Sequence, residues 1–72
     1  GEYDLILANI HRNILIEHMP AYAKSLREGG ELWLSGFYKE DIAYLTQAAE
    51  QVGLKHTETN CHNEWQWLRL KK

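Results

Sequence analysis

The chain has 72 residues, of which 44% are hydrophobic and 25% charged, and this balance excludes a disordered or fibrous polypeptide. Its formal net charge of −2 and its scattered Lys and Arg residues form no basic tract, so the sequence does not indicate nucleic acid as a direct partner. A single cysteine, Cys61, excludes an internal disulfide, and the lack of a long apolar stretch or a signal-peptide pattern predicts a cytoplasmic protein that is not in a membrane.

Residues 4–10 form a short continuous apolar run rather than an alternating one. This pattern is typical of a strand that is buried on both faces of a parallel sheet, and it predicts a central strand. The chain has no initiating Met and enters this run within two residues. We therefore expect the sequence to begin at a cut in front of the strand.

From Asn13 onward, apolar residues recur every three or four positions, which predicts an amphipathic helix that ends at Gly29-Gly30. These apolar positions are Leu15, Met19, Tyr22 and Leu26. Asn13 is available as the N-cap. Pro20 interrupts the pattern at a cost of about 3 kcal/mol in an ideal helix interior, so we expect a kink or a restart there.

A second strand and a second helix follow. Residues 31–35 contain the apolar run Leu-Trp-Leu directly after the double glycine, which predicts a strand. Four apolar positions then share one face of a helix: Ile42, Leu45, Ala49 and Val52. Glu40 and Asp41 lie near the positive end of this helix, and Gly53 is expected to cap its C-terminus.

Two β-prone runs, residues 55–59 and 64–70, flank the turn-rich residues 60–63 and predict a hairpin. The order strand, helix, strand, helix, strand, strand predicts parallel pairing through right-handed crossovers, followed by an antiparallel return at the sheet edge. The fold class is therefore α/β with two main helices.

Five groups of residues occur together along the chain: Tyr3 to Ile10, Asn13 to Ile16, Leu26 to Gly30, Leu34 to Gly36, and Glu64-Trp65 followed by Leu68 to Lys71. This set resembles the bacterial methyltransferases of ribosomal protein L-eleven, a family of class I S-adenosylmethionine-dependent methyltransferases. The resemblance implies that residues 1–72 are the C-terminal half of a Rossmann-like catalytic domain. It also implies a four-stranded mixed sheet of the order 4-5-7-6, with the seventh strand antiparallel.

The resemblance implies methyl transfer from S-adenosylmethionine to amines of one ribosomal protein, at lysine side chains and the N-terminus. Positioning of an uncharged amine can contribute roughly 7–11 kcal/mol, so no nucleophilic or metal-binding residue need be present. The sequence has no glycine-rich strand-to-helix loop and no acidic residue that ends a second strand. We therefore expect the isolated fragment neither to bind the cofactor tightly nor to catalyse.

Asn9 is the predicted catalytic residue. It falls at the C-terminal end of the first strand, the edge where open α/β sheets bind ligands, and its amide oxygen could accept a hydrogen bond from the incoming amine. The resemblance implies that Ala8, Asn9 and Ile10 lie at the cofactor and methyl-transfer site. The alternative is that Asn9 is simply a turn or cap residue, since Asn is common after strands.

Three residues are predicted to contact substrate. Gly36 ends the next parallel strand at the same edge, where a missing side chain could leave room. His11 and Asn13 follow Asn9 in the sequence. His11 and the adjacent Arg12 could instead simply be solvated, because loops at this edge both carry function and tolerate variation.

Several residue groups have simpler interpretations. His56, Cys61 and His62 lack the paired spacing of zinc ligands, so no metal site is predicted. The three tryptophans, Trp33, Trp65 and Trp67, could form an aromatic binding surface, but packing in the core and hairpin is the commoner role. Two other functions remain open: a self-contained α/β interaction module, and a fragment of another nucleotide-binding enzyme such as a dehydrogenase.

Overall fold

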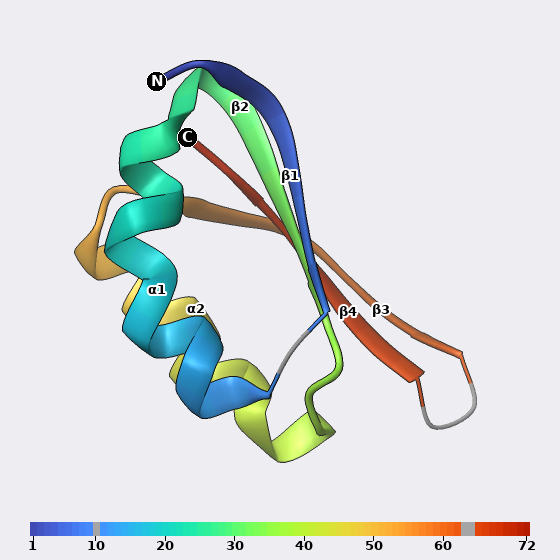
Figure 1. The fold of residues 1–72 in the computed structure, drawn as a ribbon. Helices are drawn as coiled ribbons and strands as arrows, with labels where there is room; N and C mark the ends of the chain where they lie inside the picture. The colour runs from blue at the N-terminus through green and yellow to red at the C-terminus, as the bar shows by residue number, and fades with distance from the viewer. Residues whose placement is uncertain (10, 63–64) are drawn as a thin grey trace.

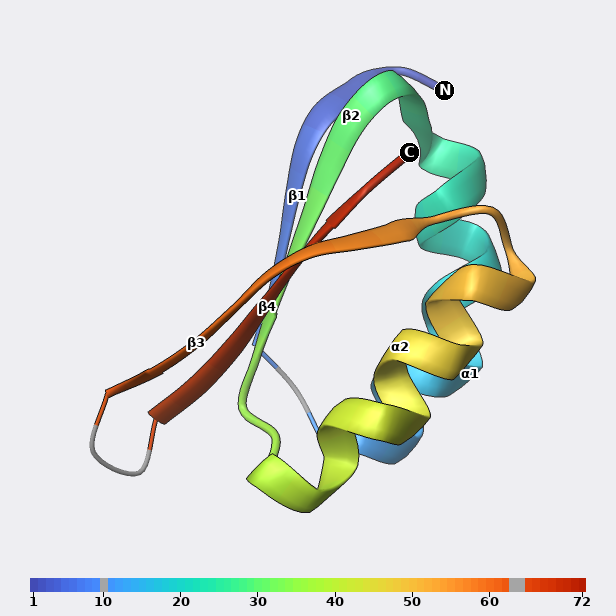
Figure 2. The same cartoon turned by 180° about the vertical axis from the view of Figure 1, so that it is seen from behind.

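The computed structural model describes residues 1–9, 11–62 and 65–72. Its elements are, in chain order, β1 (Tyr3–Asn9), α1 (Arg12–Ser25), β2 (Leu26–Ser35), the short 3-10 helix η1 (Lys39–Asp41), α2 (Ile42–Gln51), β3 (Lys55–His62) and β4 (Trp65–Lys71). Both α-helices lie on one face of the sheet, as the two opposite views show (Figures 1 and 2). None of the described helices is long and apolar enough to cross a membrane.

The sheet has the order β1-β2-β4-β3. β1 pairs with β2 in parallel, while β4 is antiparallel to both β2 and β3. This arrangement confirms the predicted order 4-5-7-6 with an antiparallel seventh strand. It places the C-terminal ends of β1 and β2 next to each other, with Asn9 opposite Ser35.

The hydrophobic core lies between the sheet and the two helices. From the sheet, its buried residues are Ala8, Leu26, Leu32, Leu34, Leu68 and Leu70; from the helices they are Leu15, Met19, Ala23, Leu45 and Ala49, and from the connecting segments Phe37 and Leu54. Successive strand residues point to opposite faces, so the neighbours of these core residues point away from the helices. We call this second surface the helix-free face.

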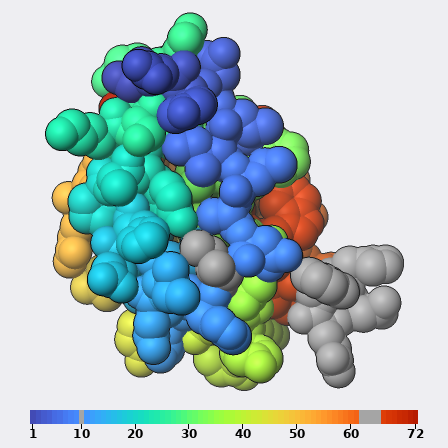
Figure 3. Space-filling view, viewed as in Figure 1, coloured from blue at the N-terminus to red at the C-terminus, as the bar shows by residue number. Residues whose placement is uncertain are grey.

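β1 differs from its prediction as a strand buried on both faces. Its side chains on the helix-free face are exposed, at 46% for Leu5 and 69% for Leu7, whereas Ala8 is buried under the helices. β1 is also at the edge of the described sheet rather than at its centre. Both faces of β1 are therefore apolar, but the helices of this chain cover only one of them. Figure 3 shows the side chains of β1, in blue, reaching the molecular surface.

The boundaries of α1 differ from the prediction at both ends. The helix begins at Arg12 with His11 at the N-cap position, so Asn13 is not the N-cap. It ends at Ser25 rather than at Gly29-Gly30, and Leu26 is already the first residue of β2. Pro20 lies within the helix, which continues through it as one element without a restart. At the C-terminal end, the Lys72 ammonium donates hydrogen bonds of 2.7 Å to the carbonyl oxygens of Ala23 and Leu26.

The double glycine belongs to β2. Gly29 has a φ of 82°, in the left-handed region that favours glycine. A Cβ on Gly30 would lie 2.9 Å from the Arg27 carbonyl oxygen and 3.0 Å from the Tyr3 carbonyl oxygen. The pair therefore permits an irregular stretch of β2 to pass close to β1.

The second helix matches its prediction. Leu45 and Ala49 are buried, and Ile42 and Val52 pack against the core. Gly53, with a φ of 84°, donates to the Glu50 carbonyl oxygen at 3.1 Å. Leu54 donates to the Ala49 carbonyl oxygen at 2.9 Å. These two bonds are those of a Schellman cap, so Gly53 ends the helix as expected.

The hairpin of β3 and β4 is also present, but β3 is longer than predicted. Asn60, Cys61 and His62 continue β3 rather than forming the turn. The remaining predicted turn residue, Asn63, and the predicted strand residue Glu64 lie outside the described residues.

Candidate functional site

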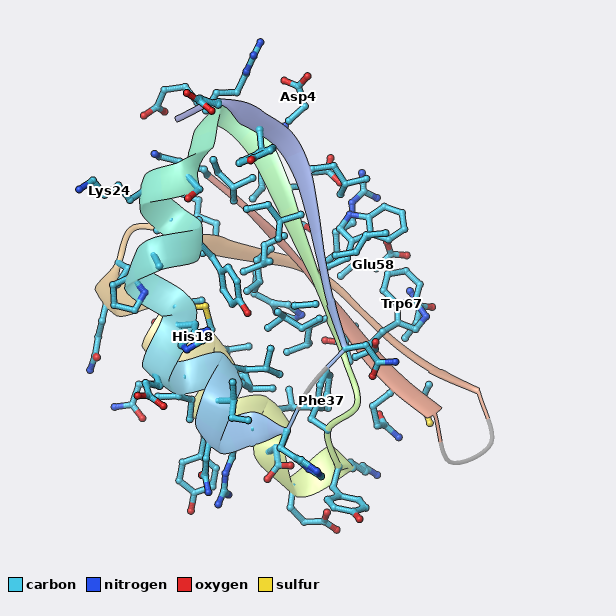
Figure 4. All side chains as sticks on the ribbon, viewed as in Figure 1. Asp4, His18, Lys24, Phe37, Glu58 and Trp67 are labelled. Carbon is cyan, nitrogen blue, oxygen red and sulfur yellow. The ribbon has the colours of Figure 1, made fainter. Side chains whose placement is uncertain are left out.

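A cavity of about 470 Å³ opens at the C-terminal ends of β1 and β2. Its lining residues are Leu7, Ala8 and Asn9 from β1, Trp33, Leu34 and Ser35 from β2, and Trp67 from β4. The alternation of the strands places Leu7, Asn9, Trp33, Ser35 and Trp67 on the helix-free face. Figure 4 shows Trp67 on the side of the sheet away from the helices.

Asn9 lines this cavity and is exposed, so its amide is available to a ligand. Its neighbour Ala8 is 8% exposed and belongs to the core. Ile10, the third residue predicted at the cofactor site, lies outside the described residues. The structure therefore brings Asn9 and Ala8 to one cavity and leaves the position of Ile10 a prediction.

Two stacked tryptophans form an aromatic wall of the cavity. The rings of Trp33 and Trp67 are 5.5 Å apart and inclined by 21°. Both side chains are half-buried on the helix-free face, so they pack on each other across the sheet and not in the core. The alternation of β2 around the buried residues Leu32 and Leu34 is the sequence signal that would have placed Trp33 on this face. The side chain of Trp65 is not among those described.

Hydrogen bonds and an ion pair hold the Trp33 ring of this wall in place. The Trp33 indole donates to Glu31 at 2.9 Å, and Arg69 donates to the two oxygens of the same carboxylate at 2.7 and 3.0 Å. The Arg69 guanidinium also lies 5.7 Å from the centre of the Trp33 ring. Hydrogen bonds from Arg69 and then Trp33 lower the pKa of Glu31 from 4.5 to about 2. Glu31 thus carries a negative charge that holds both partners in place.

A second, more polar pocket of about 220 Å³ lies among the segments that follow β1 and β2. It is lined by His11, Arg12, Asn13, Gly36, Tyr38 and Asp41. All three residues predicted to contact substrate are in this set, although Asn9 is not. Gly36 has a φ of 85°, so the backbone alone favours glycine at this position.

Sequence reasoning did not include Tyr38 and Asp41 among the site residues. Asp41 is only 8% exposed and accepts a 3.0 Å hydrogen bond from the Arg12 guanidinium. Its other carboxylate oxygen accepts the Tyr38 backbone N–H at 2.9 Å. The Tyr38 contact is a local capping interaction at the start of η1, three positions apart. No local sequence signal predicts the contact with Arg12, because Arg12 and Asp41 are 29 positions apart.

The chemistry that these residues offer is hydrogen bonding beside apolar aromatic surface. Among residues 1–9, 11–62 and 65–72, no group of three or more His, Cys, Asp or Glu side chains could hold a metal ion. The cavity combines one exposed amide with an apolar aromatic wall. Such a site can orient a polar nitrogen without supplying a nucleophile of its own.

Similarity to known proteins extends along the chain. Ribosomal protein L11 methyltransferase of Porphyromonas gingivalis is 55% identical over 68 residues, which cover 94% of this chain and 23% of that protein. The protein of the same name from Bacteroides thetaiotaomicron is 42% identical, over 90% of this chain and 23% of its own length. This chain thus spans about a quarter of the length of these curated relatives.

Two solved structures share the fold. The crystal structure of ribosomal protein L11 methylase from Lactobacillus delbrueckii subsp. bulgaricus superposes with a TM-score of 0.88 at 27% identity, over 97% of this chain and 36% of that one. The M1.HpyAVI–SAM complex superposes with a TM-score of 0.81 over 99% of this chain and 45% of that one, but at 15% identity it shows the fold alone.

The family model described as ribosomal protein L11 methyltransferase (PrmA) matches residues 1–72. This match and the relatives favour a methyltransferase over a dehydrogenase fragment or a self-contained interaction module. The chain belongs to the ribosomal protein L11 methyltransferase family.

Proposed function

We propose that residues 1–72 form the substrate-side, C-terminal part of the catalytic domain of an S-adenosylmethionine-dependent methyltransferase that acts on amines of a ribosomal protein. The observation that carries the proposal is Asn9, exposed at the C-terminal end of a parallel strand and lining a cavity of about 470 Å³. Open α/β sheets bind ligands at this edge. Family membership supplies the reaction and the substrate class. Such a substrate implies that the enzyme acts in the cytoplasm.

The described residues fit one side of the cofactor. The cavity is open at Asn9, and the small side chain of Ala8 adds no bulk beside it. This sequence has no glycine-rich strand-to-helix turn and no acidic residue that ends a second strand, the features that hold a nucleotide cofactor in such sheets. Ala8, Asn9 and Ile10 would therefore contact the cofactor, and residues outside this sequence would provide most of its affinity. When bound, S-adenosylmethionine supplies a methyl group activated for displacement.

Asn9 would orient the substrate amine. Its amide oxygen can accept a hydrogen bond from an amine N–H and so direct the nitrogen lone pair into the cavity. Because the nitrogen becomes cationic as it is alkylated, this hydrogen bond becomes charge-assisted in the transition state. An interaction that is stronger in the transition state than in the bound substrate accelerates the chemical step.

The aromatic wall would help to keep the amine uncharged. Trp33 and Trp67 present apolar ring surface to the cavity, and desolvation disfavours the charged form of a lysine amine. Only the uncharged form has a lone pair for methyl transfer. His11, Asn13 and Gly36, together with Tyr38, would contact parts of the substrate protein beyond the reacting amine.

The test is the Asn9→Ala substitution in the full-length enzyme that contains this segment. A hydrogen bond to a charged group contributes about 1.5–3 kcal/mol, so kcat should fall roughly 10- to 150-fold. Stability should change by less than about 0.5 kcal/mol, because the side chain is exposed. Initial rates with a radiolabelled methyl donor, together with mass spectrometry of the ribosomal protein, measure the effect.

A matched control is Gln47→Ala, which removes another exposed amide, but from α2. Its kcat should equal that of the wild type. If Asn9→Ala also retains the wild-type kcat, Asn9 does not orient the amine and the proposed site is wrong.

A further inference from the structure

Asp41 joins the two chain segments that leave the C-terminal ends of β1 and β2. Its Oδ1 accepts the Arg12 guanidinium at 3.0 Å, and Arg12 stands three positions after Asn9. Its Oδ2 accepts the Tyr38 backbone N–H at 2.9 Å, and Tyr38 stands three positions after Ser35. One carboxylate therefore ties together the segments that follow Asn9 and its neighbour Ser35.

The Arg12 side chain makes two further contacts besides the one with Asp41. Its guanidinium lies 5.0 Å from the centre of the Tyr44 ring of α2, within the range of a cation–π contact. Its Nε also donates to the Asn13 amide oxygen at 3.4 Å. Asp41, Tyr44 and Asn13 thus fix the direction in which the chain enters α1.

This ion pair is better placed to fix geometry than a surface pair. The side chains of Arg12 and Asp41 are 37% and 11% exposed, whereas those of Arg27 and Asp4, which form a pair of similar length, are 55% and 78% exposed. Exposed pairs contribute little because solvent screens them. Loss of the Asp41 carboxylate would leave both the Arg12 charge and the Tyr38 N–H without this partner.

We propose that Asp41 is a positioning residue for methyl transfer, which holds Asn9 at the cavity by tying Arg12 to the segment that follows β2. The inference rests on the proposed role of Asn9, through which Asp41 acts. Misplacement of a reacting group by about 1 Å can cost roughly 100-fold in rate. Asp41 itself does not contact the substrate amine.

The experiment uses the full-length enzyme with the substitutions Asp41→Asn, Asn9→Ala and both together. Asp41→Asn should lower kcat by about tenfold or more, while the dissociation constant of S-adenosylmethionine, measured by isothermal titration, changes less than about twofold. The double variant should be no slower than Asn9→Ala alone, because Asp41 acts only through Asn9. A purely structural role would instead multiply the two losses.

Arg12→Gln is the second variant, since its more exposed side chain should be easier to replace if Asp41→Asn folds poorly. It should show the same loss of kcat and the same lack of additivity with Asn9→Ala. Asp4→Asn, which breaks the exposed pair with Arg27, is the control and should leave kcat unchanged.

The outcomes separate the two proposals. Wild-type kcat in Asp41→Asn and Arg12→Gln, with a slow Asn9→Ala enzyme, would overturn the positioning role and leave the proposed function intact. Multiplied losses in the double variant would also overturn it. Wild-type kcat in Asn9→Ala would overturn the proposed function itself.

Discussion

Replacement of two strand leucines by alanine should show how unequal the two faces of the sheet are in the isolated 72-residue chain. Leu32 is fully buried between β2 and the helices, whereas Leu7 is 69% exposed on the helix-free face. Leu→Ala removes three carbons, worth about 0.8 kcal/mol each when buried, and a residual cavity adds to this loss. Leu32→Ala should therefore cost about 3–5 kcal/mol, and Leu7→Ala less than about 1 kcal/mol.

The larger value is comparable with the total stability. At about 0.05–0.15 kcal/mol per residue, a chain of this length has a free energy of unfolding of roughly 4–11 kcal/mol. Urea titration followed by tryptophan fluorescence gives both midpoints, and equal m-values would show that the transitions are comparable. If Leu7→Ala is as destabilising as Leu32→Ala, the helix-free face is not open in the isolated chain and the assignment of the two faces is wrong.

Three further predictions concern charge and cofactor. Because the pKa of Glu31 is lowered to about 2 when folded, its contribution is fully present above about pH 4.5 and is lost as the pH falls toward 2. The urea midpoint of Glu31→Gln should therefore lie below that of the wild type at pH 6 and converge with it near pH 2. Lys72→Met should cost about 1–2 kcal/mol in thermal or urea unfolding, because it removes two hydrogen bonds to carbonyl oxygens at the end of α1; an unchanged midpoint would contradict this reasoning. The isolated chain should show no micromolar binding of S-adenosylmethionine by isothermal titration, and such binding would show that the segment holds the cofactor unaided.

Elements with strong local signals were predicted from the sequence with little error. The second helix has four apolar positions on one face and a glycine directly after them, and both features were found as expected. The sheet order followed from the alternation of strands and helices and from the family resemblance. In these cases local preference and tertiary packing favour the same structure.

The end of α1 shows where local signals fail. Leu26 fits the helical period, and it would be buried either as the last helical residue or as the first residue of a strand. Pairing of Leu26 with Tyr3 and the hydrogen bonds from Lys72 decide in favour of the strand. Both partners are distant in the sequence, so periodicity cannot reveal them.

The candidate site shows the same contrast. The place of Asn9 at the end of a parallel strand is a local feature that the sequence reveals, and its role there stays a prediction. Asp41 could not be found in this way, because its significance comes from the contact with Arg12, which is 29 positions away and follows a different strand. Packing in the core and hairpin was expected for Trp33 and Trp67 because large aromatics are usually buried, whereas strand alternation places both on the helix-free face, where they stack.

The two pockets at this edge of the sheet differ in polarity, so they would bind different parts of a substrate. The apolar cavity holds Asn9 and the aromatic wall, and under the proposed function it would take the uncharged amine. The polar pocket holds His11, Asn13 and Gly36, and it would take the surrounding peptide. Asp41 lines the polar pocket while binding Arg12, close in sequence to Asn9. A substrate protein that occupied the polar pocket would therefore contact the same segments that position Asn9. Substrate binding and the alignment of the amine would then be coupled through the buried Asp41 carboxylate.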